Sequence, residues 1–228
     1  MNTTPDRKDS VEWRRYEQMR PRTAIEIDAV TLAGYTGHFQ FDDGVAAAVT
    51  LDGKALFIQL LGQPRAQLFP EALDAFFIKV VPAQITFARA AGFVSSLTLH
   101  QNGFELPAQR IDRSAFKELE KALEERVART EPFENGEKVL RAMIEDQRRG
   151  EPDYAIMSAP LAHAVREQLP LLREELERLG ELQTATLSKV STEGFDQYAL
   201  EFAHGKMEGG ISIAPSGEVN GMFIRRPD

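Results

Sequence analysis

The sequence predicts an all-β domain followed by an α+β domain, and three observations support this. Between residues 35 and 110, short segments rich in Phe, Ile, Val and Leu are separated by turn dipeptides such as Asn102-Gly103. From Phe116 onward, apolar residues recur at helical spacing. Strand patterns then return near residue 182. We expect an eight-stranded antiparallel, lipocalin-like barrel, followed by helices packed on a curved antiparallel sheet.

The first 24 residues are expected to form an arm ahead of the barrel domain, which spans 25–112. Within the arm, residues 9–19 favour a short helix. Eight strands are expected in the barrel, each bounded by a turn signal, at 35–42, 45–51, 55–61, 66–69, 75–80, 84–90, 94–101 and 104–111. Apolar Ile85 and Phe87 alternate with polar Gln84 and Thr86, which predicts a sheet with one buried face and one wet face.

A linker helix is expected over 113–133, because Phe116, Leu119, Leu123 and Val127 fall on one helical face. The α+β domain would then span 134–228. Two helices are expected in it at 136–149 and 158–179, the second divided or kinked at Pro170 and capped by Gly180. Four strands should follow, at 182–190, 195–203, 206–214 and 219–225.

Composition narrows the classes of partner. The 35 acidic and 27 basic residues give the chain a formal net charge of −8, which argues against nucleic acid or an anionic membrane surface as partner. Without cysteine there is no disulfide, thiolate nucleophile or Cys-bound metal. No segment approaches the roughly 18 apolar residues of a membrane span. The polar N-terminus predicts a cytoplasmic protein as written, or a periplasmic one if a signal or upstream domain was removed.

Four segments of the barrel region carry a family resemblance. They are LAGYTGHFQF at 32–41, LFIQLLGQPRAQLFP at 56–70, FFIKVVPAQITFAR at 76–89 and LTLHQNGFELPAQR at 97–110. In order and spacing they resemble the small β-barrel domain of unknown function that follows the catalytic domain in many bacterial serine β-lactamase-like and penicillin-binding-protein-like hydrolases. Residues 152–180 and the ending GGISIAPSGEVNGMFIRR are similar to the helical-plus-sheet module that often accompanies it.

The resemblance implies an accessory module. The catalytic domain of those hydrolases is far larger than the roughly thirty residues that precede the barrel region, since domains run to about 100–200 residues. The family's catalytic residues therefore have no positions in this sequence. Ser114 and Lys117 have S-x-x-K spacing, but S-D-N and K-T-G motifs are missing, and Ser114 is better placed to cap a helix N-terminus. No catalytic residue is predicted.

Candidate ligand contacts come from the barrel and from one tyrosine of the α+β domain. The four histidines lack metal-ligand spacing, so neither a metal nor another cofactor is expected. His38 and His100 lie on predicted strands and would be ligand contacts if they meet across a lumen. Most barrel phenylalanines are expected in the core, and any that face a lumen would suit an acyl or aromatic ligand. The candidate residues are His38, Phe57, Phe77, Phe87, His100 and Tyr198.

These observations predict a non-catalytic binding or accessory module whose partner is a hydrophobic small molecule or a protein, with a homodimer as a further arrangement. The alternative is a cone-fold, ketosteroid-isomerase-like enzyme with an acid/base pair in the α+β domain. Its candidate residues are Asp153, Tyr154, Asp196 and Tyr198. A third hypothesis is a structural subunit that docks on a separately encoded serine hydrolase.

Overall fold

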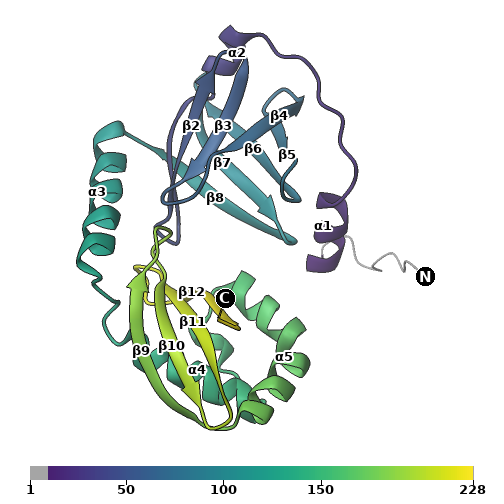
Figure 1. Cartoon of the computed structure of the whole chain (residues 1–228). Coiled ribbons are helices and arrows are strands. Elements are labelled where there is room, and N and C mark those ends of the chain that lie inside the picture. The colour runs from purple at the N-terminus through teal and green to yellow at the C-terminus, as the bar shows by residue number, and fades with distance from the viewer. Residues whose placement is uncertain (1–9, 228) are drawn as a thin grey trace. The chain divides into compact units, whose positions relative to one another are not determined.

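The computed structural model describes residues 10–227 and confirms the predicted fold class. The chain divides into two compact units, one reaching Glu120 and the other starting at Lys121. Figure 1 labels the elements of each unit, and the dividing point falls within helix α3 (Arg113–Arg129). Each unit is described by itself. No helix among the described residues is both long and apolar enough to cross a membrane.

The first unit contains two short helices and a closed barrel. The helices are α1 (Val11–Gln18) and α2 (Ala29–Ala33). The strands are β1 (Gly37–Phe41), β2 (Ala46–Asp52), β3 (Ala55–Leu60), β4 (Ala66–Ala72), β5 (Ala75–Ile78), β6 (Ala83–Ala90), β7 (Phe93–Gln101) and β8 (Phe104–Ile111). Each strand pairs antiparallel with the next, and β8 returns to β1 with His38 opposite Ile111. Closure leaves the sheet without free edges.

The turn dipeptides act as predicted. Asn102 and Gly103 both have positive φ, 54° and 83°, as a two-residue hairpin turn of type I′ requires. The turn expected between the strands at 84–90 and 94–101 also forms, and it places an alanine in the same region: Ala91 has φ 49°, followed by Gly92 at 84°. The short helix α2 was also missed. Its N-cap Asp28 accepts a hydrogen bond from the Thr31 amide at 2.9 Å.

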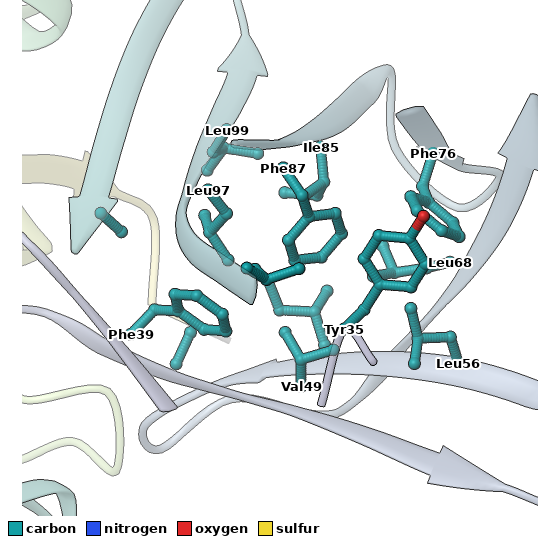
Figure 2. Packing of buried hydrophobic residues seen from close by; sticks show 14 of the residues in the cluster. Tyr35, Phe39, Val49, Leu56, Leu68, Phe76, Ile85, Phe87, Leu97 and Leu99 are labelled. Carbon is teal, nitrogen blue, oxygen red and sulfur yellow. The ribbon is translucent and has the colours of Figure 1, made fainter. Parts of the chain in front are cut away.

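A packed apolar core fills the barrel (Figure 2). Tyr35, Phe39 and Phe76 are completely buried, and the Phe87 ring contacts all three with ring centroids 4.9–6.1 Å apart. The prediction that most of Phe57, Phe69, Phe76, Phe77, Phe87 and Phe93 are core is wrong: Phe76 and Phe87 join the core cluster, and four do not. The four are Phe57, Phe69, Phe77 and Phe93. They lie at positions whose strand neighbours point inward, so they do not line a lumen either.

The second unit is an open sheet covered by helices. Its helices are α4 (Gly136–Arg149), the 3₁₀ turn η1 (Tyr154–Ile156) and α5 (Ala159–Leu179). Its strands are β9 (Leu182–Val190), β10 (Asp196–Phe202), β11 (Gly205–Ile213) and β12 (Val219–Arg225), antiparallel in the order β12-β11-β10-β9. Core residues such as Leu140, Leu176 and Leu200 lie between helices and sheet. Irregular pairing of β10 with β9 adds curvature.

Three details of the helices differ from the predictions. Helix α3 ends at Arg129 rather than at residue 133, and Thr130 then takes a positive φ of 52°. Asp112, not Ser114, caps α3: its carboxylate accepts from the Ala115 amide at 2.8 Å and from the Ser114 hydroxyl at 2.6 Å. Helix α5 runs undivided through Pro170, and Gly180 is its C-cap as expected.

Candidate binding site on the outer face of the barrel

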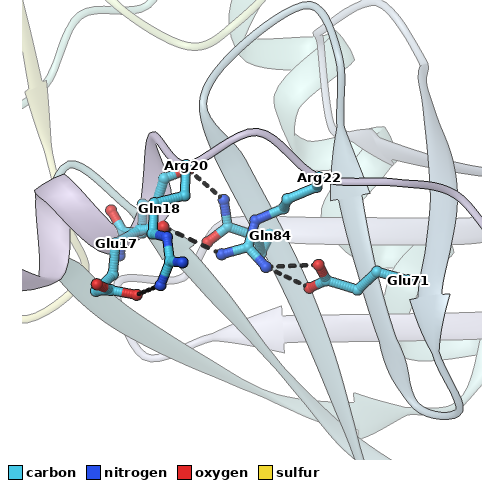
Figure 3. A network of polar contacts seen from close by, with 6 residues as sticks. All are labelled: Glu17, Gln18, Arg20, Arg22, Glu71 and Gln84. Carbon is cyan, nitrogen blue, oxygen red and sulfur yellow. Dashed lines mark hydrogen bonds and ion pairs between the residues drawn. The ribbon is translucent and has the colours of Figure 1, made fainter.

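Helix α1 is held on the outer face of the barrel by the last residue of the helix, Gln18. The Gln18 side chain accepts a hydrogen bond from the Gly103 amide at 2.7 Å and donates one to the Phe104 carbonyl at 3.4 Å. The Gln84 side chain, from β6, donates to the Gln18 carbonyl at 2.8 Å (Figure 3). Both glutamine side chains are buried, so their polar groups depend on these hydrogen bonds in place of hydrogen bonds to water.

Arg22 forms a second attachment just after the helix. Its Nη1 lies 2.7 and 2.5 Å from the two carboxylate oxygens of Glu71 on β4, and its Nη2 donates to the Glu17 carbonyl at 3.2 Å (Figure 3). The Ile25 amide then donates to the Pro70 carbonyl at 2.8 Å. Polar contacts of Gln18, Arg22 and Ile25 therefore bind the arm and the residue after it to the barrel.

A polar cavity of about 450 Å³ lies between α1 and the barrel. It is lined by Trp13, Arg14, Glu17, Gln18, Arg22, Gln84, His100 and Glu105. His100 Nε2 lies 2.8 Å from the Thr86 hydroxyl, and Nδ1 lies 3.6 Å from a Glu105 oxygen. Burial lowers the pKa of His100, an effect that the nearby Glu105 carboxylate partly opposes. The imidazole is therefore neutral near pH 7, and the cavity suits polar rather than hydrophobic groups.

A smaller, more apolar groove of about 290 Å³ adjoins the arm. It is lined by Gln18, Met19, Arg20, Arg22, Phe77, Ile78, Lys79, Val80, Val81, Pro82 and Gln84. Met19 is 64% exposed and Val80 81% exposed, which is unusual for large apolar side chains that lie close together. The Lys79 ammonium lies over the Phe69 ring, 3.8 Å from its centroid.

The predicted ligand contacts from the barrel do not form one site. His38 packs against the Phe116 ring with centroids 4.5 Å apart, and its pKa is lowered by burial and then by the charges of Arg113 and Lys117. His100 contacts the polar cavity instead, so the two histidines do not meet across a lumen. The other barrel candidates are equally dispersed. Phe57 lies under Arg65, Phe77 lines the apolar groove, and Phe87 is core.

Sequence reasoning missed the residues that build the cavity from the arm side. Arg14 and Gln18 are one helical turn apart, but the same spacing is common on solvated helices. The positions of Arg14 and Arg22 depend on contacts with residues 89 and 49 positions away in the chain. The one signal in the sequence for this part of the cavity was the pair of polar residues Arg14 and Gln18 close to Trp13, the sole tryptophan.

Tyr198, the sixth candidate, lines a separate cavity of about 530 Å³ in the second unit. Beside it lies the completely buried carboxylate of Asp196, which accepts from the Phe133 amide at 2.8 Å and from Arg126. Burial raises the pKa of Asp196 and lowers the pKa of Arg126. Burial, and then the Asp196 charge, raises the pKa of Tyr198 to about 12.

The four residues of the predicted acid/base group are only partly brought together. Asp196 and Tyr198 lie close together beside Gly136, and the Asp196 charge acts on the Tyr198 hydroxyl. Asp153 instead caps η1 by accepting from the Ala155 amide at 3.0 Å, and Tyr154 lies beneath the Arg166 guanidinium. Both Asp196 oxygens already accept hydrogen bonds, so the carboxylate ties the α3–α4 connection to β10. This arrangement leaves Tyr198 as the group that faces the cavity.

The chain was compared with protein families and with known proteins, and the family match falls on the barrel. Residues 21–116 match a family model described as a domain of unknown function, DUF3471. The chain is also 31% identical over 84 residues to "Penicillin-binding protein 4*" of Bacillus subtilis (strain 168). That match covers 37% of this chain and 19% of the relative, so the chain corresponds to about a fifth of the relative's length. The barrel is thus related to an accessory domain of a penicillin-binding-protein-like hydrolase, as the sequence resemblance predicted.

Proposed function

We propose that this chain is a non-catalytic accessory module that binds a penicillin-binding-type serine hydrolase through the outer face of its barrel. The observation that carries the proposal is the match of 84 residues of this chain to a minor part of a much larger penicillin-binding protein. In that relative the matched segment makes up about a fifth of the chain, and the other four-fifths lies outside it. A segment related to part of this chain is therefore joined to further sequence of a penicillin-binding protein in at least one case.

The packing of the barrel favours a protein partner over a hydrophobic small molecule. A ligand-holding barrel needs an unfilled interior, whereas here fully buried side chains such as Phe39, Phe76 and Ile85 occupy it. Apolar groups that are available to a partner lie instead on the outer groove, at Met19 and Val80. Exposed apolar side chains that gather in a groove are typical of protein–protein contact sites.

The proposal is tested by retrieving the tagged chain from cells of its source and treating the co-purified proteins with fluorescent penicillin. We expect a penicillin-labelled protein with the unmodified chain and its loss with Val80→Asp, which places a charge in the groove. Val30→Asp is the matched control, because Val30 is 86% exposed on α2 and does not line the groove. If all three chains retrieve no labelled protein, or all three retrieve it equally, the proposed partner or the proposed surface is wrong.

A second candidate function, proton transfer at a small carbonyl substrate, is favoured by one observation. Asp196 has a raised pKa and lies close to the hydroxyl of Tyr198, a residue that borders a cavity. The probe is cyclohex-3-enone, whose isomerisation to the conjugated enone needs an acid and a base. Turnover that disappears in Tyr198→Phe would support this enzyme and contradict a non-catalytic module. Absence of turnover in the unmodified chain would remove this candidate.

A further inference from the structure

Helix α1 and the surface that binds it belong to different parts of the sequence. The family match begins at residue 21, after the end of α1 at Gln18. The groups that hold the helix, from Gln84, Gly103 and Phe104, all lie within the match. The barrel domain therefore supplies a surface whose occupant comes from the segment in front of it.

The contact is specific in shape and in hydrogen bonding. The Gln18 carboxamide takes the place of a peptide group, because it accepts from one backbone amide and donates to the next carbonyl at the β7–β8 turn. A Cβ atom on Gly103 would lie 2.2 Å from the Val11 carbonyl oxygen, so the turn and the helix are in direct contact. The Arg14 Nε group also donates to the Gly103 carbonyl at 2.6 Å.

The helix is also weakly held compared with the barrel. It has eight residues, which is too short for an isolated helix to be stable in water. Gln18 is the only buried residue of the helix, and its apolar residues Val11, Trp13 and Tyr16 are partly or largely exposed. Elements with few buried apolar contacts open at a lower free energy than the core does.

We propose that the barrel surface formed by Gln84, Gly103 and Phe104 is a docking site for a helix that ends in glutamine, and that α1 is its detachable occupant. The same segment supplied by another molecule fits this surface once the chain's own helix has left. Gln18 lines both the polar cavity and the apolar groove, so departure of α1 changes both. This inference does not depend on the identity of the hydrolase partner proposed above.

The sole tryptophan, Trp13, lies on α1 and reports its position in the full chain. In Gln18→Ala we expect a red-shifted Trp13 emission and stronger quenching by acrylamide, because the helix loses its side-chain anchor. Met19→Ala is the matched control, since it shortens an exposed neighbouring side chain and leaves the hydrogen bonds of Gln18 in place. Unchanged quenching in Gln18→Ala would overturn the proposal.

A fluorescein-labelled peptide of residues 10–22 then tests the vacated surface by fluorescence anisotropy. We expect it to bind the Gln18→Ala chain, not the unmodified chain, whose site is occupied, and not the Gln18→Ala/Gln84→Ala chain. Failure to bind a Gln18→Ala chain in which Trp13 has become accessible would overturn the proposal. No hydrolase is present in this assay, so its failure is distinct from failure of the proposed function.

Hydrogen exchange in the unmodified chain covers the case in which the variants do not fold. The Gly103 amide is bonded to the Gln18 side chain, whereas Leu99 belongs to the β6–β7 ladder of the barrel. Detachment of α1 predicts that the Gly103 amide exchanges faster than the Leu99 amide, through an opening that leaves the barrel folded. Equal exchange of the two amides through global unfolding alone would show that α1 does not leave the folded barrel.

Discussion

The barrel and the α+β unit differ in where they place their polar side chains. The barrel closes on itself, so every strand has two neighbours and its interior is apolar. Its polar groups, such as Gln84 and His100, stand on the outer face around the arm. The α+β unit has an open sheet and a long connection from α3, and it encloses the charged pair Asp196–Arg126. Closure gives every barrel strand a backbone partner on both sides, whereas in the open unit a buried carboxylate accepts a hydrogen bond from the Phe133 amide.

This difference bears on function. Asp196 uses its oxygens on Arg126 and the Phe133 amide, so its raised pKa reflects a structural junction as readily as a catalytic group. The polar groups of the barrel border an open cavity and a segment that lies outside the family match. A shifted pKa therefore shows first that a group is buried. The hydrogen-bond partners of the group then decide whether it belongs to a functional site or to a structural contact.

The largest expected effect tests whether the two units are independent. Phe76→Ala removes a completely buried ring and should destabilise the barrel by about 3–5 kcal/mol. Leu200→Ala should cost the α+β unit about 2–5 kcal/mol. Urea unfolding followed by Trp13 fluorescence reports the first unit, and far-UV circular dichroism reports both. If Leu200→Ala shifts the Trp13 transition as much as Phe76→Ala does, the units unfold as one and the comparison fails.

The next prediction contrasts a buried ion pair with a more exposed one. Asp196→Ala leaves Arg126 and the Phe133 amide without their acceptor, and should destabilise the α+β unit by about 3 kcal/mol. Glu71→Ala breaks the ion pair between Glu71 and Arg22. Both side chains of this pair are more than a fifth exposed, so its loss should destabilise the barrel by only about 1 kcal/mol. Urea midpoints measure both.

Asp196→Asn is the control for the carboxylate itself. Its amide oxygen still accepts from the Phe133 amide, so we expect a smaller loss than in Asp196→Ala. Equal losses in Asp196→Ala and Glu71→Ala would show that burial of the pair does not distinguish the two units.

The barrel could be predicted from sequence because its signals are local. The Asn102-Gly103 turn and the alternation around Ile85 each lie within a few residues of the strands they define. Single positions near element ends were less certain: the sequence favoured Ser114 as the α3 cap, and Asp112 two residues earlier supplies it. Both residue types cap helices, so only the backbone geometry decides between them.

The candidate site could not be predicted because its contacts are distant in sequence. Gln18 meets Gly103 across 85 positions and Gln84 across 66. Neither glutamine has a spacing that differs from that of a solvated surface. The sequence could not show which phenylalanines face the barrel interior, for a related reason. Phenylalanine on a strand indicates a buried or partly buried face, but the alternation that separates Phe76 from Phe77 depends on a register fixed by the whole barrel.

A smaller loss of stability is expected when glycine is replaced by alanine, and its cause differs between the two units. Gly210 in β11 lies under the Phe223 ring, and an added Cβ would sit 2.1 Å from a ring carbon, so Gly210→Ala should cost about 2 kcal/mol through overpacking. Gly53 in the barrel has open space but a φ of +61°, so Gly53→Ala should cost about 1 kcal/mol through backbone strain alone. Urea midpoints measure both variants.

A double-mutant cycle distinguishes these causes. Phe223→Ala removes the ring that the new methyl group would strike, so it should offset most of the cost of Gly210→Ala. The same second substitution should leave the cost of Gly53→Ala unchanged, because the two residues share no contact. Purely additive costs for Gly210→Ala and Phe223→Ala would contradict the packing explanation.

The smallest effect is a pH dependence of the barrel. Burial lowers the pKa of His100 below its unfolded value of about 6.5, and Arg22 acts in the same direction while Glu105 opposes it. The unfolded chain therefore binds more protons, so this contribution to stability is present above the unfolded pKa of about 6.5 and is lost as the pH falls below it, through the lowered pKa of the folded state. Urea midpoints followed by Trp13 fluorescence should fall over this range, and less steeply in His100→Gln, where the lowered pKa of His38 still acts. An equal slope in His100→Gln would show that protonation of His100 does not couple to the fold of the barrel.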